Sequence, residues 1–323
     1  DEAIRCLREA LCQVFADDKS YIEGVIALRK ALTKKGDTRG ALSCSFFLQD
    51  DIGNSTLLNL VPPIDRARSF VATANRQPAD SPGASQYFIQ AASNFEERGW
   101  LAHAANAAES AKDFVRARTL WARLSQTLAN GKDADLYAAA LAHFNLARTS
   151  RALKDNITAS DAVISSVHLL EEAADRYEAI GQRERAFDCF QVLIAIGKET
   201  GSVEHALEGY VNIIRILRED QLRTYALQTF DEAIDFVTEK QELSAAAMLA
   251  REMSVYAQKE GLFQISNYAS LRQAQLWRDL SALTMNRGGP PEIAENALLA
   301  ATATYADLGQ FRKAKGSYVE LAY

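Results

Sequence analysis

The sequence is poor in the residues that interrupt helices. It holds only 16 glycines and 6 prolines in 323 residues, and its alanines come in runs such as 104–105, 107–108 and 138–140. Alanine gives up no side-chain entropy in a helix, and so few turn residues leave little room for the connections between strands. We therefore expect an all-α protein.

Cysteine is scarce as well. The four cysteines, Cys6, Cys12, Cys44 and Cys189, form no C-x-x-C pair and have no histidine at metal-ligand spacing. This pattern gives no sign of a zinc site or a redox motif. We expect four buried free thiols, no metal, no cofactor, and a reducing, cytoplasmic location.

Basic residues are outnumbered by acidic ones. The 36 Lys and Arg are interleaved with 42 Asp and Glu, which gives a formal net charge of −6. Nucleic-acid surfaces are clustered and basic, so we predict no nucleic-acid partner. No run reaches the ~18 to 20 apolar residues of a membrane span, and the first residues are unlike a signal peptide. We therefore predict no transmembrane segment.

The motifs of common catalytic sites are also missing. The metalloprotease H-E-x-x-H, the phosphate-binding loop and the dinucleotide-binding G-x-G-x-x-G do not occur, and the sequence around Ser85 lacks the final glycine of a nucleophile elbow. The four histidines lie on different predicted helices. We predict no catalytic residue and no enzyme activity.

Apolar residues recur at helical spacing almost throughout, with short Gly, Asp, Asn or Pro breaks. The step Val61-Pro62-Pro63 should kink or break the fourth helix, because proline removes a backbone donor. The clearest linker is 76–83, where Ser81 and Pro82 should cap and open the next helix. The predicted helices are 1–16, 19–35, 37–51, 55–75, 84–98, 100–112, 114–129, 133–153, 157–180, 182–199, 203–219, 221–239, 243–260, 262–283, 291–308 and 310–322.

One helical hairpin recurs along the chain. An aromatic residue ends the first helix, glycine takes a left-handed turn position, and an alanine lets the second helix lie close against the first. Weaker copies surround Ala140, Ala226 and Gly261, and Gln221 replaces the glycine before Ala226. The clear copies are Phe95, Gly99 and Ala104; Tyr177, Gly181 and Ala186; and Tyr305, Gly309 and Ala314.

This pattern resembles the tetratricopeptide repeat family. The helix pairs, at roughly 40 residues against 34 in the regular repeat, are similar to the SNAP-type branch of these solenoids. The resemblance implies an all-α, right-handed superhelix of antiparallel helix hairpins. It covers a repeat domain at 84–323, preceded by an N-terminal helical segment at 1–75 that is either degenerate repeats or a bundle.

A stack of such hairpins leaves a concave groove lined by the first helix of each pair, and such grooves bind peptides or partner helices. The residues expected there change from acidic to basic along the stack, which would orient a charged partner. The alternative is that they are ordinary exposed helix faces. They are His168, Glu171, Asp175, Glu178, Glu208, Arg215, Arg218, Arg251, Gln258 and Lys259.

These observations predict a non-enzymatic scaffold or adaptor that binds a protein or peptide partner in its groove. Two other functions stay open, besides that of an enzyme with an unrecognised site. One is a ligand- or peptide-sensing regulatory repeat domain of a larger protein. The other is a permanent structural subunit, buried in a large complex or in a homo-oligomer.

Overall fold

A computed structural model of the chain describes residues 1–13, 19–48, 56–78, 81–130 and 134–321. These residues form sixteen α-helices and the 3-10 helix η2, with no strand among them. The all-α prediction is confirmed. The chain divides into two compact units, Asp1–Leu169 and Leu170–Tyr323, and the boundary falls inside helix α9.

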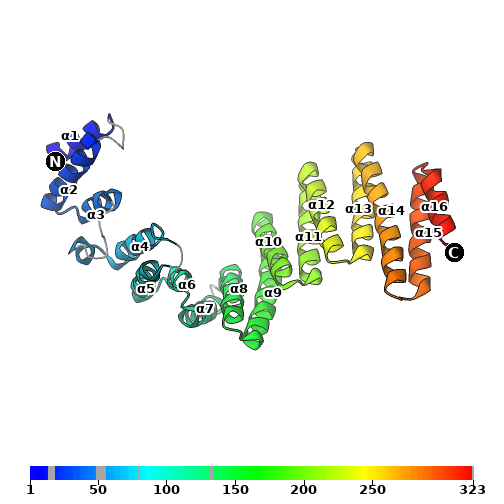
Figure 1. The fold of residues 1–323 in the computed structure, drawn as a ribbon, viewed down its shortest axis with the longest axis horizontal. Helices are drawn as coiled ribbons and strands as arrows, with labels where there is room; N and C mark the ends of the chain where they lie inside the picture. The colour runs from blue at the N-terminus through cyan, green and yellow to red at the C-terminus, as the bar shows by residue number, and fades with distance from the viewer. Residues whose placement is uncertain (14–18, 49–55, 79–80, 131–133, 322–323) are drawn as a thin grey trace. The chain divides into compact units, whose positions relative to one another are not determined.

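The helices follow one another along the chain as antiparallel neighbours joined by short turns in most places (Figure 1). Their bounds are α1 Glu2–Leu11, α2 Lys19–Lys35, α3 Thr38–Phe47, η2 Thr56–Leu60, α4 Pro63–Ala74, α5 Pro82–Glu97, α6 Leu101–Ser110, α7 Phe114–Ala129, α8 Leu136–Ala152, α9 Asn156–Ala179, α10 Arg183–Thr200, α11 Val203–Glu219, α12 Arg223–Glu239, α13 Leu243–Lys259, α14 Phe263–Asn286, α15 Pro291–Asp307 and α16 Phe311–Leu321.

Most of the predicted helices match observed ones closely. The Pro62-Pro63 step does break the fourth predicted helix, which becomes η2 and then α4, with Pro63 at its first position. Ser81 caps α5 by accepting a hydrogen bond from the backbone N–H of Ala84, as expected. Some ends of the predicted segments lie outside the described residues. These are the last residues of the predicted helices 1–16, 37–51 and 310–322, the first residues of 55–75 and 133–153, and part of the linker 76–83.

The predicted hairpin turns are confirmed. Gly99, Gly181 and Gly309 have φ angles of +72°, +73° and +68°, the left-handed conformation that glycine adopts without steric strain. Gln221 takes the same conformation, with φ at +59°. The turn geometry is therefore a property of the repeat, and it is kept where the glycine is lost.

The second unit is held together by close helix packing. A Cβ added to Gly209 of α11 would lie 2.7 Å from the carbonyl oxygen of Phe190 on α10, and one added to Gly197 would clash with Ala206. The largest side chains at the centre, including Tyr210 and Phe230, are at most 1% exposed. Small residues thus let the backbones approach, and aromatic residues fill the space that remains.

Ion pairs link successive hairpins at a repeated position. Arg183 at the start of α10 pairs with Asp220 after α11, at 2.8 Å, and Arg223 at the start of α12 pairs with Glu260 after α13, at 2.5 Å. The corresponding first residues of α14 and α16 are Phe263 and Phe311, which are 66% and 71% exposed. One register position therefore carries a clamp in two hairpins and an exposed aromatic ring in the next two.

Two apolar clusters lie among the described residues of the first unit. A small one joins α1, α2 and α3 around Leu32, and a larger one extends from Leu42 on α3 to Ala162 on α9. The division into 1–75 and 84–323 stays a prediction.

The expectation for the cysteines was half wrong. Cys44 and Cys189 are buried, and burial raises the pKa of the Cys189 thiol to about 12. Cys6 and Cys12 are exposed, because α1 buries only Ile4 against its neighbours. All four thiols are free.

Candidate partner-binding surface

All ten residues predicted for the groove lie on the surface of first helices of hairpins or immediately beside them. None is buried. His168, Asp175, Arg218, Arg251, Gln258 and Lys259 are exposed, and Glu171, Glu178, Glu208 and Arg215 are half-buried.

Arg215 does not present a free positive charge. Its guanidinium donates to the carboxylate of Glu178 on α9, lies 3.6 Å from Glu219, and donates to Asn212 at 3.3 Å. The hydrogen bond to Glu178 raises the pKa of Arg215. Where the predicted surface changes from acidic to basic, the two charges therefore form an ion pair between α9 and α11.

An acidic sector remains on the N-terminal half of α11. Burial raises the pKa of Glu208, and the negative charge of Glu171 on α9 raises it further. The two carboxylates therefore repel each other across neighbouring helices. This sector would disfavour an acidic partner segment.

The basic residues gather farther along, where Arg218 of α11 and Arg251 of α13 line one pocket of about 410 Å³. The guanidinium of Arg218 lies over the Tyr256 ring, 5.0 Å from its centroid, which fixes its position. Neither arginine has a carboxylate partner within the described ranges. The pocket thus offers two unneutralised guanidinium groups.

Apolar side chains lie between these arginines. Met248 and Val255, both on α13, line the same pocket and are 59% and 44% exposed. Glu252 and Tyr256 complete the lining. A pocket of this kind can bind an apolar side chain and a neighbouring carboxylate together.

Met248 and Val255 were missed from the sequence, although a signal was present. They stand 40 residues after Glu208 and Arg215, which is the interval between Ala186 and Ala226. Following the register would have found them. The predicted set consists mainly of charged residues, and charge does not mark an apolar binding position.

The other predicted residues are not brought to this pocket. Gln258 and Lys259 lie at the end of α13 outside the lining, and His168 lies on the first unit's side of the boundary in α9. No group of three metal-binding side chains occurs in the part of the chain that the structure describes. No helix there is long and apolar enough to cross a membrane.

No protein-family model and no curated protein matches the chain. Among solved structures it is similar to aspartyl phosphate phosphatase F from Bacillus subtilis, at 12% identity and a TM-score of 0.39, over 99% of this chain and 92% of that one. It is similar to a Rap protein complexed with competence and sporulation factor, at 13% identity and a TM-score of 0.28, over 94% and 97% of the two chains.

A third similar structure is a signal transduction ATPase with a tetratricopeptide repeat sensor from Pyrococcus horikoshii. Its identity is 10% and its TM-score 0.26, over 95% of this chain and 53% of that one. Likenesses at this level support no functional assignment. The chain's own residues must support one.

Proposed function

We propose that this chain is a non-enzymatic scaffold or adaptor that binds a protein or peptide partner along the first helices of its second unit. The observation that carries the proposal is the pocket between α11 and α13. There Arg218 and Arg251 lie beside the exposed Met248 and Val255. If Met248 and Val255 were buried, this face would be an ordinary helix surface.

The pocket would recognise a partner by two kinds of contact. An apolar side chain placed over Met248 and Val255 would be removed from water, which is the main source of affinity in such sites. A carboxylate next to it would accept charge-assisted hydrogen bonds from Arg218 and Arg251. Both groups would come from a single extended or helical segment.

The acidic sector would set the direction of that segment. Glu171 and Glu208 repel a negatively charged end, and the arginines attract it. Charge arrangement of this kind affects specificity and association rate more than affinity. The scaffold role includes a cytoplasmic location and a place in a protein complex.

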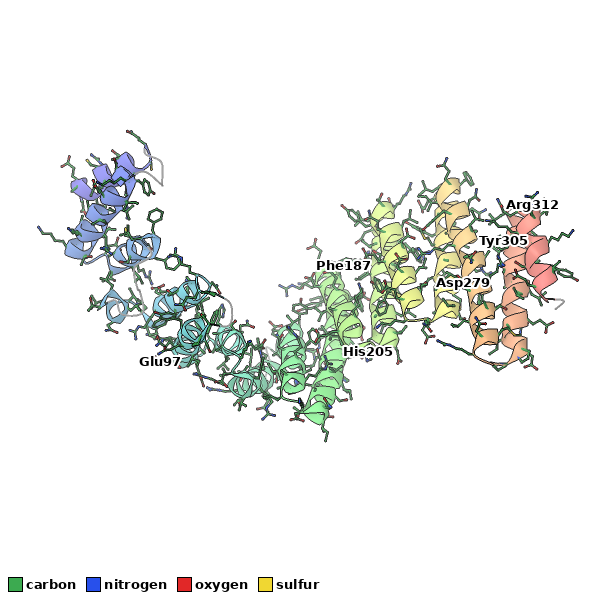
Figure 2. The ribbon with its side chains drawn as sticks, viewed as in Figure 1. Glu97, Phe187, His205, Asp279, Tyr305 and Arg312 are labelled. Atoms are coloured by element: carbon green, nitrogen blue, oxygen red, sulfur yellow. The ribbon has the colours of Figure 1, made fainter. Side chains whose placement is uncertain are left out.

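The test is affinity capture from an extract of the source cell with two chains of equal net charge. One carries Arg218→Glu and Arg251→Glu in the pocket. The matched control carries Arg185→Glu and Arg312→Glu, which are exposed residues elsewhere in the second unit; Arg312 projects from α16 (Figure 2). Circular dichroism must first show that both variants are as helical as the wild type.

A partner that the wild type and the control retain, and that the pocket variant loses, supports the proposal. Retention by all three chains would contradict it. Loss from both variants would show that only net charge matters, which also contradicts a specific pocket.

A second candidate function, the permanent structural subunit, has its own observation. On α16, Phe311 and Tyr318 are 71% and 61% exposed, whereas Phe190 and Phe230, at the register of Tyr318, are at most 7% exposed. A surface of exposed aromatic residues fits a stable contact with another chain. Light scattering measures the molar mass of the wild type and of a Tyr318→Glu variant and separates the two functions. A structural subunit that uses this surface would form an oligomer as the wild type and a smaller species as the variant, whereas an adaptor would show no such change.

A further inference from the structure

Charged residues become rarer from one first helix to the next along α9, α11, α13 and α15. Equivalent eleven-residue stretches begin 18 residues before the small buried residue of each second helix, such as Ala314. They hold five, three, two and no Asp, Glu, Lys or Arg, in the order 168–178, 208–218, 248–258 and 296–306. The middle of α15 therefore has no charge on any side.

The two sides of α15 differ in burial although neither is charged along its middle. On one side, Ala301 and Tyr305 pack with Ala274 of α14 and Ala314 of α16, and all four are at most 7% exposed. On the other side, Leu299 is 44% exposed. A helix that is apolar on both sides is normally covered on both. The exposed side of α15 is thus unusual for a surface in contact with water.

This exposed side has the residue spacing of a coiled-coil seam. Its members recur at intervals of three and four residues, the spacing by which one helix packs along another. Small side chains in such a seam let two helix axes approach and leave room for larger side chains from the second helix. The seam is about 15 Å long at ~1.5 Å per residue, so about three turns of helix cover it. The residues of this α15 seam are Asn296, Leu299, Ala303 and Ala306, all exposed.

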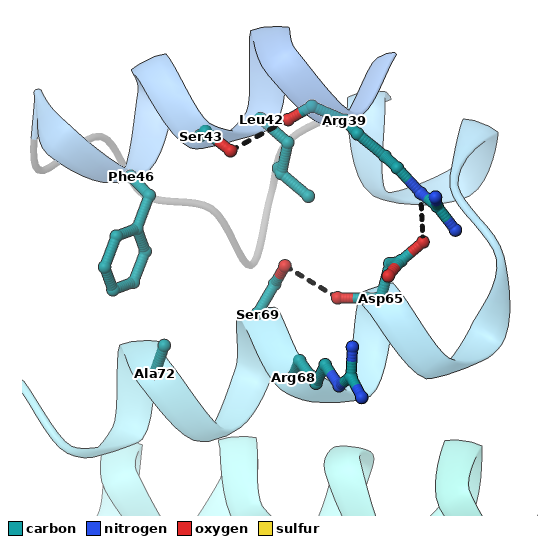
Figure 3. Close-up of a pocket in the computed structure, with 8 residues that line it drawn as sticks. All are labelled: Arg39, Leu42, Ser43, Phe46, Asp65, Arg68, Ser69 and Ala72. Carbon is teal, nitrogen blue, oxygen red and sulfur yellow. Dashed lines mark hydrogen bonds and ion pairs between the residues drawn. The ribbon is translucent and has the colours of Figure 1, made fainter.

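Two other exposed faces mix charges with apolar residues. In the groove between α3 and α4, Arg39, Asp65 and Arg68 lie near Leu42 and Phe46 (Figure 3). Nε of Arg39 donates there to Oδ2 of Asp65 at 2.6 Å. The pocket between α11 and α13 also combines arginines with apolar side chains. Water solvates mixed faces of this kind well, whereas the α15 seam offers it only one polar side chain.

Acidic residues frame the α15 seam. Glu292 and Glu295 lie at its N-terminal end and Asp307 at its C-terminal end, and all three are exposed. None has an ion pair with a described residue. Asp307 is the last residue of α15, where the helix dipole disfavours a negative charge. Lysine or arginine at both ends of a covering helix would neutralise these acids. A second copy of α15 would add acids instead, and an anionic lipid surface would be repelled.

We propose that the α15 seam binds an amphipathic helix of a partner protein. Leucine-like side chains of that helix lie over Leu299, Ala303 and Ala306, and a lysine or arginine at each end lies beside Glu295 and Asp307. Removal of the uncharged seam from water supplies the affinity, and the basic ends supply specificity. The pocket of Arg218 and Arg251 has no lining residue on α15 and favours a carboxylate. The two surfaces therefore select different segments, and this inference does not rest on the pocket.

The probe is a displayed library of helical peptides, four to five turns long, selected on the full chain. Their heptad a and d positions and terminal residues vary freely in an alanine and glutamine frame. We expect enriched peptides with Leu, Ile, Met or Phe at a and d and with Lys or Arg at both ends. Ala303→Glu buries an unpaired charge in the contact and should weaken their binding about tenfold or more. Gln228→Glu adds the same charge at an exposed position of α12 and should leave binding unchanged.

Charge exchange then tests the ends of the seam. Fluorescence anisotropy should show binding weakened about tenfold by Glu295→Lys with Asp307→Lys, since each exposed ion pair contributes up to a factor of about five. Binding should return when the terminal basic residues of the peptide become glutamate. The matched control is Glu232→Lys with Glu239→Lys, two exposed acids of α12. It should bind the original peptide like the wild type.

Circular dichroism checks the fold of each variant. No enrichment, enrichment of acidic ends, or binding that Ala303→Glu leaves intact would overturn the proposal. Peptides that bind Ala303→Glu but not the Arg218→Glu, Arg251→Glu variant would belong to the α11–α13 pocket. Self-association of the wild type that Ala303→Glu abolishes would also overturn the proposal, because it would assign the seam to a second copy of the chain.

Discussion

The hairpins of the second unit differ at one position, the first residue of the second helix. In α9–α10 and α11–α12 this residue is Arg183 or Arg223, and each pairs with an acid at the end of the following first helix. In α13–α14 it is Phe263, and the residue at the acid's position after α15 is Leu308. Both members of the clamp have changed together, while the helices, the turn and the core are alike.

This difference separates what the repeat requires from what it permits. The left-handed turn is present in clamped and unclamped hairpins, and a small buried residue follows it in each, Ala186 and Ala226 at 0% exposure, Ser266 at 8% and Ala314 at 7%. Exposed ion pairs contribute little, so their loss leaves the fold intact. The edge position is therefore available for surface properties, and in the last two hairpins it carries exposed aromatic rings.

The largest effect should come from the core that both kinds of hairpin share. Phe230 is 0% exposed, and Phe230→Ala should lower the free energy of unfolding by about 3 to 5 kcal/mol, because it removes buried apolar surface and leaves a cavity. Urea denaturation followed by circular dichroism measures this. The exposed Phe263→Ala is the control and should change stability by less than ~0.5 kcal/mol. Equal losses would show that the exposed ring also supports the fold.

A smaller effect should follow from tightening the closest helix contact. Gly209→Ala places a methyl group 2.7 Å from the Phe190 carbonyl oxygen and should lower the free energy of unfolding by about 1 to 3 kcal/mol. Gly316→Ala, on α16, has open space at its Cβ and is the control. It should be neutral or slightly stabilising, since alanine favours helix. An unchanged Gly209→Ala variant would mean that α10 and α11 can move apart freely.

The clamp itself should matter less. A double-mutant cycle on Arg223→Ala and Glu260→Ala should give a coupling of about 0.2 to 1 kcal/mol, weaker in high salt, because Arg223 is largely exposed. Introducing Phe263→Arg with Leu308→Glu should place a third clamp in the series. Its coupling energy should match that of the natural pair. A coupling near zero in both would show that the ion pairs are incidental to the repeat.

The smallest change in stability at neutral pH should come from the contact between α9 and α11. This contact holds one ion pair, Glu178 with Arg215, and one repulsive pair, Glu171 with Glu208. The folded-state pKa of Glu208 is raised, so its contribution to stability is present at low pH and is lost as the pH rises through that pKa. Glu208→Gln should therefore be more stable than the wild type at pH 7. The difference should vanish below the ordinary glutamate pKa of 4.5.

Thermal unfolding between pH 3.5 and 7.5 measures that difference. Glu232→Gln, on an exposed part of α12, controls for the loss of one negative charge. A Glu208→Gln variant that is less stable than the wild type at pH 7 would show that the carboxylate is stabilised by a partner.

Much of the fold could be predicted from particular residues. Proline at 62 and 63 marked the break before α4, Ser81 marked the cap of α5, and Gly181 with Ala186 marked a hairpin, because each acts through its own backbone or nearest turn. The candidate surface was predicted less well. Arg218 and Arg251 do share a pocket, but Arg215 is neutralised by Glu178, a residue 37 positions away on another helix.

The sequence by itself determined the all-α class, the positions of the helices and the repeated hairpin turn, because these depend on spacing and backbone preference within a few residues. The tertiary structure alone decided which charges are left without a partner. It set Arg68 and Arg218 over aromatic rings, paired Arg215 and Arg39 with acids, and left a groove between α3 and α4. Charge neutralisation and groove formation depend on side chains from different helices, and no pattern along one helix specifies which neighbour will face it.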